Sequence, residues 1–267
     1  MIRDITFGQY YPASSPIHRL DPRIKILWTM LLIILIFLSN NPLSFLVLIG
    51  FTIGVIACST VPFRFILRGM KPILFLIIFT AVVNLFMIRG ETPVLTLWKF
   101  SVYPEGIRSA LIMLARMFLL VAGTCMLTYT TSPILLTDGI EALLEPLRVI
   151  RFPSHEIAMM MTIALRFIPT LIDETDKIMK AQTARGADFT SGNLFRRAKS
   201  LLPILIPLFV SAFRRADELA SAMESRCYRG GEHRTRMKTM QLSKGDGWAV
   251  AVACILLLAI ILIRILA

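Results

Sequence analysis

Two arginines that follow long helical patterns are the residues of this sequence best suited to bind a protein partner. They stand in the tripeptides Ala184-Arg185-Gly186 and Ser225-Arg226-Cys227. A guanidinium held at a rigid helix end offers a planar fork of donors to a carboxylate or to carbonyls in a groove. The interaction of an arginine with its own helix dipole, about 0.3–1 kcal/mol, would explain one instance. Two instances on successive helices favour a pair of partner contacts.

Enzymatic and metal-binding patterns are absent from the sequence. The pair His155-Glu156 begins an H-E-x-x-H pattern, but Met159 stands where the second histidine of a zinc protease belongs. The sequence has no G-x-x-x-x-G-K-[ST] loop for a nucleotide, and no nucleophile and base can be paired from their spacing. It therefore indicates a non-catalytic protein with no metal or cofactor of its own.

The helices that position these arginines belong to a membrane protein. Hydrophobic residues make up 56% of the 267 residues and charged residues 17%, against about 45–50% and about a quarter in soluble domains. Mean hydropathy is +0.71. Lysines and arginines outnumber acidic residues by 29 to 17, which in a membrane chain indicates loops beside anionic lipid and not a nucleic-acid partner.

Five apolar runs predict membrane-spanning helices. The first follows Asp21, a suitable N-cap, and Pro22, which is tolerated in the first turn because its missing N–H needs no partner there. Several runs are near the short end of the range of roughly 17–25 residues that spans a bilayer. The predicted spans are Ile26–Leu38, Leu43–Ser59, Pro72–Ile88, Ser109–Tyr129 and Trp248–Ile263.

The positive charges of the loops predict the orientation. The turn 39–42 between the first two spans has no charge, whereas the segment before the first span and the loop after the second are basic. The N-terminus is therefore expected inside, with residues 130–246 in the cytoplasm and Arg89–Arg108 as an external loop. The basic residues are Arg3, Arg19, Arg23 and Lys25 in the first segment, and Arg64, Arg68 and Lys71 in the loop.

A polar insert interrupts the membrane helices. Residues 131–246 hold 30 of the 46 charged side chains. Periodicity predicts an amphipathic helix over Ile134–Val149 and two long helices, from Ser154 to about Thr183 and from about Ser200 to Tyr228. Each long helix has an apolar first half, too short and interrupted for a comfortable span, and a charged second half. We expect these helices to rest as a layer under the membrane domain.

The predicted fold class is an all-α integral membrane protein with about five transmembrane helices and three amphipathic helices on the cytoplasmic side. The chain is predicted to divide into three regions. Residues 1–129 form the N-terminal segment and four spans, residues 130–246 form the helical insert, and residues 247–267 form the final span.

Several motifs of the chain resemble those of a known family. The resemblance rests on Gly8-Gln9-Tyr10-Tyr11, on the run from Ser15 to Lys25 (SPIHRLDPRIK), and on the two arginine tripeptides before a final span. Together they are similar to the transmembrane coupling subunit (T component) of energy-coupling factor transporters, over the whole length and in the same order.

The resemblance implies partners and a role for the two tripeptides. In that family the two arginines dock into grooves on two ABC-type ATPase subunits, which implies this role for Arg185 and Arg226. It further implies a scaffold in the bacterial cell membrane that passes ATP-driven closure to a separate substrate-capturing membrane subunit (S component), usually one for a vitamin or related micronutrient.

The second tripeptide departs from the family pattern. Ser225 replaces an alanine and Cys227 replaces a glycine. Because a cysteine is less suited than glycine to the left-handed cap conformation, we expect the helix to continue and to stop at Gly230. Arg226 would then lie one turn inside the helix, and Arg229 stays open as the alternative second contact.

A self-sufficient secondary transporter is the alternative function. Ion-coupled carriers usually place ionisable groups at mid-membrane, but the five predicted spans contain no Asp or Glu. Arg116 and Asn84 are their polar exceptions, and Arg116 is the better candidate for a buried contact. The absence of acidic groups counts against a carrier.

Overall fold

The structure is a computed structural model that describes residues 10–88, 95–97, 100–150, 152–187, 189, 193, 195, 199–230 and 242–266. The described residues contain eight α-helices, which divide between two compact units. One unit comprises the described residues up to Ile140 together with those after 241. The other comprises the described residues from Glu141 to 230.

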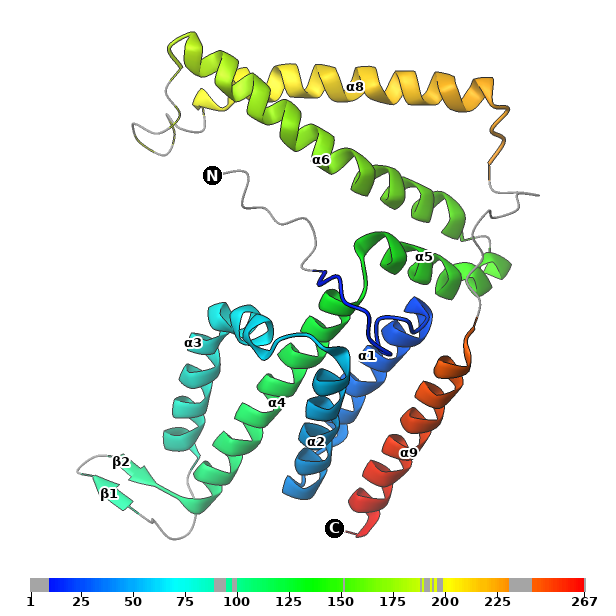
Figure 1. Cartoon of the computed structure of the whole chain (residues 1–267). Helices are drawn as coiled ribbons and strands as arrows, with labels where there is room; N and C mark the ends of the chain where they lie inside the picture. The colour runs from blue at the N-terminus through cyan, green and yellow to red at the C-terminus, as the bar shows by residue number, and fades with distance from the viewer. Residues whose placement is uncertain are drawn as a thin grey trace. The chain divides into compact units, whose positions relative to one another are not determined.

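The first unit is a bundle of apolar helices (Figure 1). Its helix α4 packs along α1, α2 and α3, and α9 packs on α1 and α2. The bounds of these helices are Pro22–Leu38 for α1, Pro42–Ser59 for α2, Phe63–Met87 for α3, Pro104–Thr130 for α4 and Lys244–Leu266 for α9. Helix α5, Pro133–Leu144, extends from this unit into the other.

Two apolar clusters hold the bundle together. Leu35, Leu48 and Leu119 are fully buried where α1, α2 and α4 meet. Ile66 of α3 is fully buried in a second cluster against α4. Gly123 permits the close approach of α4 to α1, because a Cβ there would lie 2.5 Å from Leu32 Cδ2. Small residues at crossing points are how membrane helices approach closely.

Helix α3 begins earlier than the sequence predicts. The expected span Pro72–Ile88 left the preceding basic residues in a loop, but α3 starts at Phe63 and runs through Pro72. The prediction of a loop was wrong because tertiary contacts support the first turns of α3. Tyr129 Oη donates to Phe65 O at 2.9 Å, and Met70 is buried against α4. Proline is tolerated inside membrane helices when neighbouring groups compensate in this way.

The loop expected between α3 and α4 contains a short hairpin. Strands β1, Leu95–Leu97, and β2, Phe100–Val102, pair antiparallel with Leu95 opposite Val102. With three residues in each strand the hairpin is a local feature, and the described chain is otherwise helical.

The second unit contains the long helices of the polar insert. A 3-10 helix, Glu145–Ile150, follows α5. It replaces the last turn of the helix predicted over Ile134–Val149, because Pro146 disfavours the α conformation of the residue before it. Helix α6, Ser154–Ala184, agrees with its predicted bounds, and α8, Leu202–Ser225, ends before its predicted end. These two helices pack on one another.

Five helices of the described chain are long and apolar enough to cross a membrane: α2, α3, α4, α6 and α9. The predicted number is confirmed, but the set differs. Helix α6 qualifies with 31 residues, although the sequence places it at the membrane surface. Helix α1 has 17 residues, at the lower end of the range of about 17–25 that spans a bilayer.

Candidate functional site

Arg185 is the last residue of α6 before a sharp left-handed turn. Arg185 is the C-cap of α6, with φ −86° and ψ 6°. Gly186 follows it in the left-handed conformation with φ +87°. The N–H of Gly186 donates to Thr183 O at 2.9 Å, and the N–H of Ala187 donates to Gln182 O at 3.0 Å. This pair of bonds is a Schellman motif, which satisfies carbonyls that a helix end leaves without partners.

Arg226 has the same position at the end of α8. Its backbone (φ −92°, ψ 13°) matches that of Arg185, and Cys227 follows in the left-handed conformation with φ +57°. The N–H of Cys227 donates to Glu224 O at 2.8 Å, and that of Tyr228 to Met223 O at 3.0 Å. The two tripeptides therefore end their helices with one backbone geometry.

The expectation that α8 continues to Gly230 was wrong. Sequence reasoning treated Cys227 as less suited than glycine to end a helix, but the Schellman bonds hold it in the left-handed region at a cost that glycine would avoid. Arg226 therefore lies at the helix end and not one turn inside it. Arg229, the alternative contact, follows the motif and has no counterpart near Arg185.

Both arginines are exposed and separated by the length of α8. In the described part of the chain neither guanidinium has a hydrogen-bond or ion-pair partner. Gln182, near Arg185, donates from Nε2 to Pro203 O at 3.4 Å, so the end of α6 lies beside the start of α8. Arg226 lies at the other end of α8 (Figure 1), roughly 35 Å away at about 1.5 Å per residue.

An ion pair joins the two helices where they pack on one another. Arg215 of α8 binds Glu174 of α6 with an Nη2–Oε2 distance of 3.1 Å, and both side chains are about one-third exposed or less. At the start of α6, His155 Nδ1 lies 3.0 Å from Glu141 Oε1, so this histidine is part of a structural contact. No cluster of metal-ligating side chains occurs among the described residues.

The segment before α1 forms a buried polar cluster in the bundle unit. The N–H of Asp21, the N-cap of α1, donates to Asp246 Oδ1 at 2.8 Å, and the N–H of Ser243 donates to Asp246 Oδ2 at 2.6 Å. Asp246 is 2% exposed. One carboxylate thus joins the N-termini of α1 and α9.

Lys25 and His18 complete this cluster. Lys25 Nζ donates to His18 O at 3.1 Å and to Thr130 O at 2.9 Å. His18 Nε2 faces Tyr11 O at 3.0 Å and must donate to it, which leaves Nδ1 to accept from Ser15 Oγ at 2.7 Å. Burial lowers the pKa of His18 below its ordinary value, which favours the neutral ring.

Sequence reasoning did not identify Asp246 as part of a site. Its signal is local: an acidic residue three positions after Ser243, just before an apolar run, is typical of a capping box. Its long-range bond to Asp21 has no signature in the sequence. The four residues Gly8 to Tyr11 of the resemblance are described only from Tyr10 onward.

The polar residues inside the predicted spans have structural partners. Arg116 donates from Nη2 to Ser39 O at 3.1 Å and to Asn40 Oδ1 at 3.2 Å, which fixes the turn between α1 and α2. Asn84 Nδ2 donates to Thr80 O of its own helix. Neither arrangement resembles an ion-coupling site.

The fold and the site define a class: a multi-pass membrane protein with a pair of helices whose exposed ends each present an arginine. The model of the cobalt transport protein family CbiQ matches residues 13–237. The chain belongs to this family, that of the energy-coupling factor transporter transmembrane proteins, and is a non-catalytic transmembrane subunit of such a transporter.

Three relatives illustrate the similarity, all described as energy-coupling factor transporter transmembrane protein EcfT. The protein of Clostridium kluyveri is 57% identical over 266 residues, and that of Ruminiclostridium cellulolyticum 55% over 265, each covering 99% of this chain and 98% of the relative. The Bacillus subtilis protein is 45% identical over 261 residues, 98% of both chains. They favour the transporter subunit over a self-sufficient carrier.

Proposed function

We propose that this chain transmits ATP hydrolysis by two ABC-type ATPase subunits to a substrate-capturing S component that takes up vitamins or related micronutrients. Residues 130–246 act as the coupling region, and residues 1–129 with 247–267 as the membrane domain. The observation that carries the proposal is the shared backbone geometry of the arginine-bearing ends of α6 and α8.

The spacing of the arginines supports two separate binding grooves on the partners instead of one. At a separation of roughly 35 Å, the two guanidinium groups cannot enter the same groove. One groove on each of two ATPase subunits satisfies both. Glu174 of α6 and Arg215 of α8 form an ion pair. Because the two helices are joined in this way, movement of either ATPase groove would move both helices.

The backbone around each arginine supports a rigid contact. Ala184 and Gly186 flank Arg185, and Ser225 and Cys227 flank Arg226, so the residues adjacent to each arginine in the sequence are small. The Schellman bonds fix the direction in which each arginine leaves its helix. A fixed planar fork loses little conformational entropy on binding a carboxylate.

Exposed apolar surface supports the docking of the coupling helices against lipid or the membrane domain. In the apolar half of α8, Ile206 is 63% exposed, and Phe209 and Phe213 are each 64% exposed. Soluble monomeric domains rarely leave such a row of large side chains uncovered. The basic residues before α1 support a cytoplasmic N-terminus in the bacterial cell membrane.

Replacement of the arginines tests the proposal. The full chain is expressed with tagged ATPases and the S component, and assembly is measured by pull-down for wild type, Arg185→Glu, Arg226→Glu and the double variant. Loss of a desolvated charge-assisted contact costs about 2–5 kcal/mol, which is tens- to thousands-fold in affinity. The double variant should release the ATPases. Arg226→Lys should rescue only in part, because an ammonium lacks the fork.

Arg229→Glu is the matched control, because it changes an exposed charge of the same sign three residues after Arg226. It should assemble as wild type and retain coupled ATP hydrolysis. Normal recovery of ATPases by the Arg185→Glu/Arg226→Glu double variant contradicts the proposal. A defect confined to Arg229→Glu moves the second contact beyond the Schellman turn.

A further inference from the structure

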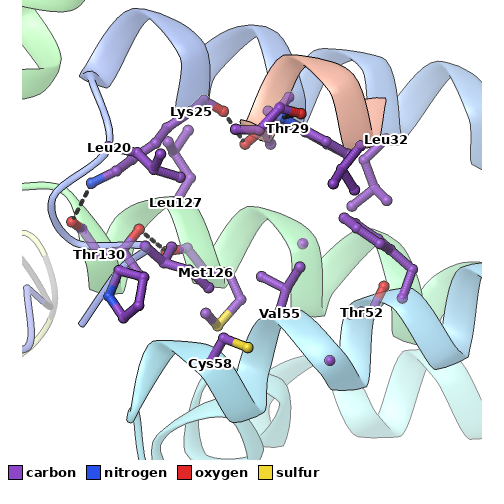
Figure 2. A pocket seen from close by; sticks show the side chains of 18 of the residues that line it. Leu20, Lys25, Thr29, Leu32, Thr52, Val55, Cys58, Met126, Leu127 and Thr130 are labelled. Carbon is purple, nitrogen blue, oxygen red and sulfur yellow. Dashed lines mark hydrogen bonds between the residues drawn. The ribbon is translucent and has the colours of Figure 1, made fainter. Parts of the chain in front are cut away.

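A half-open cavity of about 650 Å³ lies within the bundle unit (Figure 2). Helices α1, α2, α4 and α9 supply its walls, and residues of the segment before α1 lie at one end. Its volume falls within the range of roughly 300–1,000 Å³ typical of small-molecule sites. Neither the coupling helices nor the two arginines take part in it.

The cavity begins at one end of the bundle and extends toward its middle. The lining residues fall between positions 25 and 32 of α1, 51 and 58 of α2, 123 and 130 of α4, and 245 and 252 of α9. Helices α1 and α9 begin at this end, whereas α2 and α4 finish there. Seven residues of helix rise about 10 Å, or about two-thirds of one leaflet of the bilayer core.

The deep part of the cavity is suited to a hydrocarbon chain. Trp28 and Phe51 form one wall, with rings stacked at a centroid distance of 5.0 Å. The three threonines that line the cavity donate to carbonyls of their own helices: Thr29 to Lys25 O and Thr52 to Leu48 O, both at 2.8 Å, and Thr130 to Met126 O at 2.7 Å. Their hydroxyl hydrogens are therefore not available to a polar ligand.

A cation lies at the shallow end of the cavity. Lys25 lines it, and Figure 2 shows its ammonium at this end beside Thr130. Two of the three ammonium hydrogens go to backbone carbonyls, which leaves one donor. The nearby carboxylates of Asp21 and Asp246 offset part of this charge, and their described bonds go to backbone N–H groups. Arg19, exposed in the same segment, adds a positive charge.

We propose that this cavity holds one acyl chain of an anionic membrane phospholipid, with its phosphate at the Lys25 end. The orientation follows from the chemistry of the site, since the cation lies at the end of the helices and the apolar walls extend toward mid-bilayer. An acyl chain needs no hydrogen-bond partners in the deep part. A phosphate accepts the remaining hydrogen of Lys25 and is favoured there by the basic residues.

Two glycines of α2 provide a matched pair of variants. Gly54 lines the cavity and Gly50, one turn earlier, does not. A Cβ added at either position meets nothing within 4 Å, so both tolerate a larger side chain. Gly54→Phe should place its ring in the cavity and obstruct an acyl chain, whereas Gly50→Phe adds the same ring outside it.

The measurement is quenching of Trp28 fluorescence by lipids brominated on the acyl chain. The full chain carries Trp98→Phe and Trp248→Phe, which leaves Trp28 as its only tryptophan. It is reconstituted in phosphatidylcholine vesicles that contain an increasing fraction of either brominated phosphatidylglycerol or brominated phosphatidylcholine. Half-quenching should need about fivefold less of the anionic lipid, as expected for one nearby cation. Gly54→Phe should abolish this difference, and Gly50→Phe should keep it.

Native mass spectrometry of the unmodified chain gives an independent measurement. From mixed bilayers it should retain one phosphatidylglycerol in preference to phosphatidylcholine. Equal quenching by the two lipids, or an unchanged preference in a folded Gly54→Phe variant, overturns the proposal. Quenching that is lost when the chain is assembled with its partner subunits also overturns it, because a partner's side chains would then occupy the cavity.

Discussion

Two groups of charged residues in this chain differ in kind. Lys25 and Asp246 are buried, and the hydrogen bonds of their side chains to described residues go to the chain's own backbone. Arg185 and Arg226 are exposed at helix ends and have no side-chain partner in the described part of the chain. The first group assembles the bundle, and the second is free to bind another protein.

The difference shows how a charged motif can be assigned a role from its surroundings. A buried charge that lost its partners would cost several kcal/mol, so its position requires the bonds that surround it. An exposed arginine contributes at most about 1 kcal/mol to its own helix. Substitutions in the two groups should therefore separate folding from assembly.

The largest effect on folding is expected at the buried group. Asp246→Ala leaves the N–H groups of Asp21 and Ser243 without acceptors and removes an anion near Lys25, and should destabilise the chain by about 3–5 kcal/mol. Thermal unfolding of the full chain in detergent measures this. The matched control is Arg185→Ala/Arg226→Ala, which should unfold within about 1 kcal/mol of wild type. Equal melting of Asp246→Ala and wild type would remove the distinction between the groups.

A smaller effect is expected from the residues in the left-handed position. Gly186→Ala adds a Cβ at φ +87° and should destabilise the end of α6 by about 1–2 kcal/mol. Cys227→Gly should relieve strain at φ +57° and stabilise the end of α8 by up to about 1 kcal/mol. Hydrogen exchange of the Ala187 and Tyr228 amides, which close the two motifs, reports each change.

Cys227→Ala separates the backbone effect from the thiol. Alanine keeps the Cβ, so this variant should exchange at the wild-type rate. Protection of the Tyr228 amide that falls in Cys227→Gly would show that the cysteine side chain, and not the backbone bonds, holds the end of α8.

Local signals explain why much of the helical fold could be predicted from the sequence. Ser154 with Glu156 marks the start of α6, and Asp21 with Pro22 marks the start of α1. These signals act within one turn. Gly186 likewise identified the end of α6, because glycine takes the left-handed conformation without strain.

The remaining features depend on contacts that sequence patterns do not contain. The bond from Asp21 to Asp246 joins residues 225 positions apart. The early start of α3 depends on Tyr129 of another helix, and the end of α8 depends on backbone bonds that outweigh the strain at Cys227. In each case tertiary or backbone geometry overrode a local preference, and the second arginine could be placed only from the structure.

The ion pair between α6 and α8 should contribute less than the left-handed turns. Glu174 and Arg215 are partly exposed, so their coupling energy should be about 0.2–1 kcal/mol and should fall at high salt. A double-mutant cycle with Glu174→Ala and Arg215→Ala measures it. The exchanged pair Glu174→Arg/Arg215→Glu should recover stability that either single reversal loses. A swap no better than the single reversals would mean that the ion pair does not stabilise the contact between the two helices.

The smallest effect concerns His18 and the pH. Burial lowers the pKa of its imidazole below 6.5, so between the folded and unfolded pKa values the unfolded chain binds more protons. The stability from neutral His18 is therefore present above about pH 6.5 and is lost as the pH falls through the lower, folded pKa. The effect is modest because the ring is only partly buried. Unfolding midpoints from pH 8 to pH 5 should fall more steeply for wild type than for His18→Gln, whose amide can donate to Tyr11 O without titrating. Parallel curves would show that protonation of His18 costs no stability, as would follow if the Ser15 hydroxyl rotated to accept from Nδ1–H while Nε2 still donated to Tyr11 O.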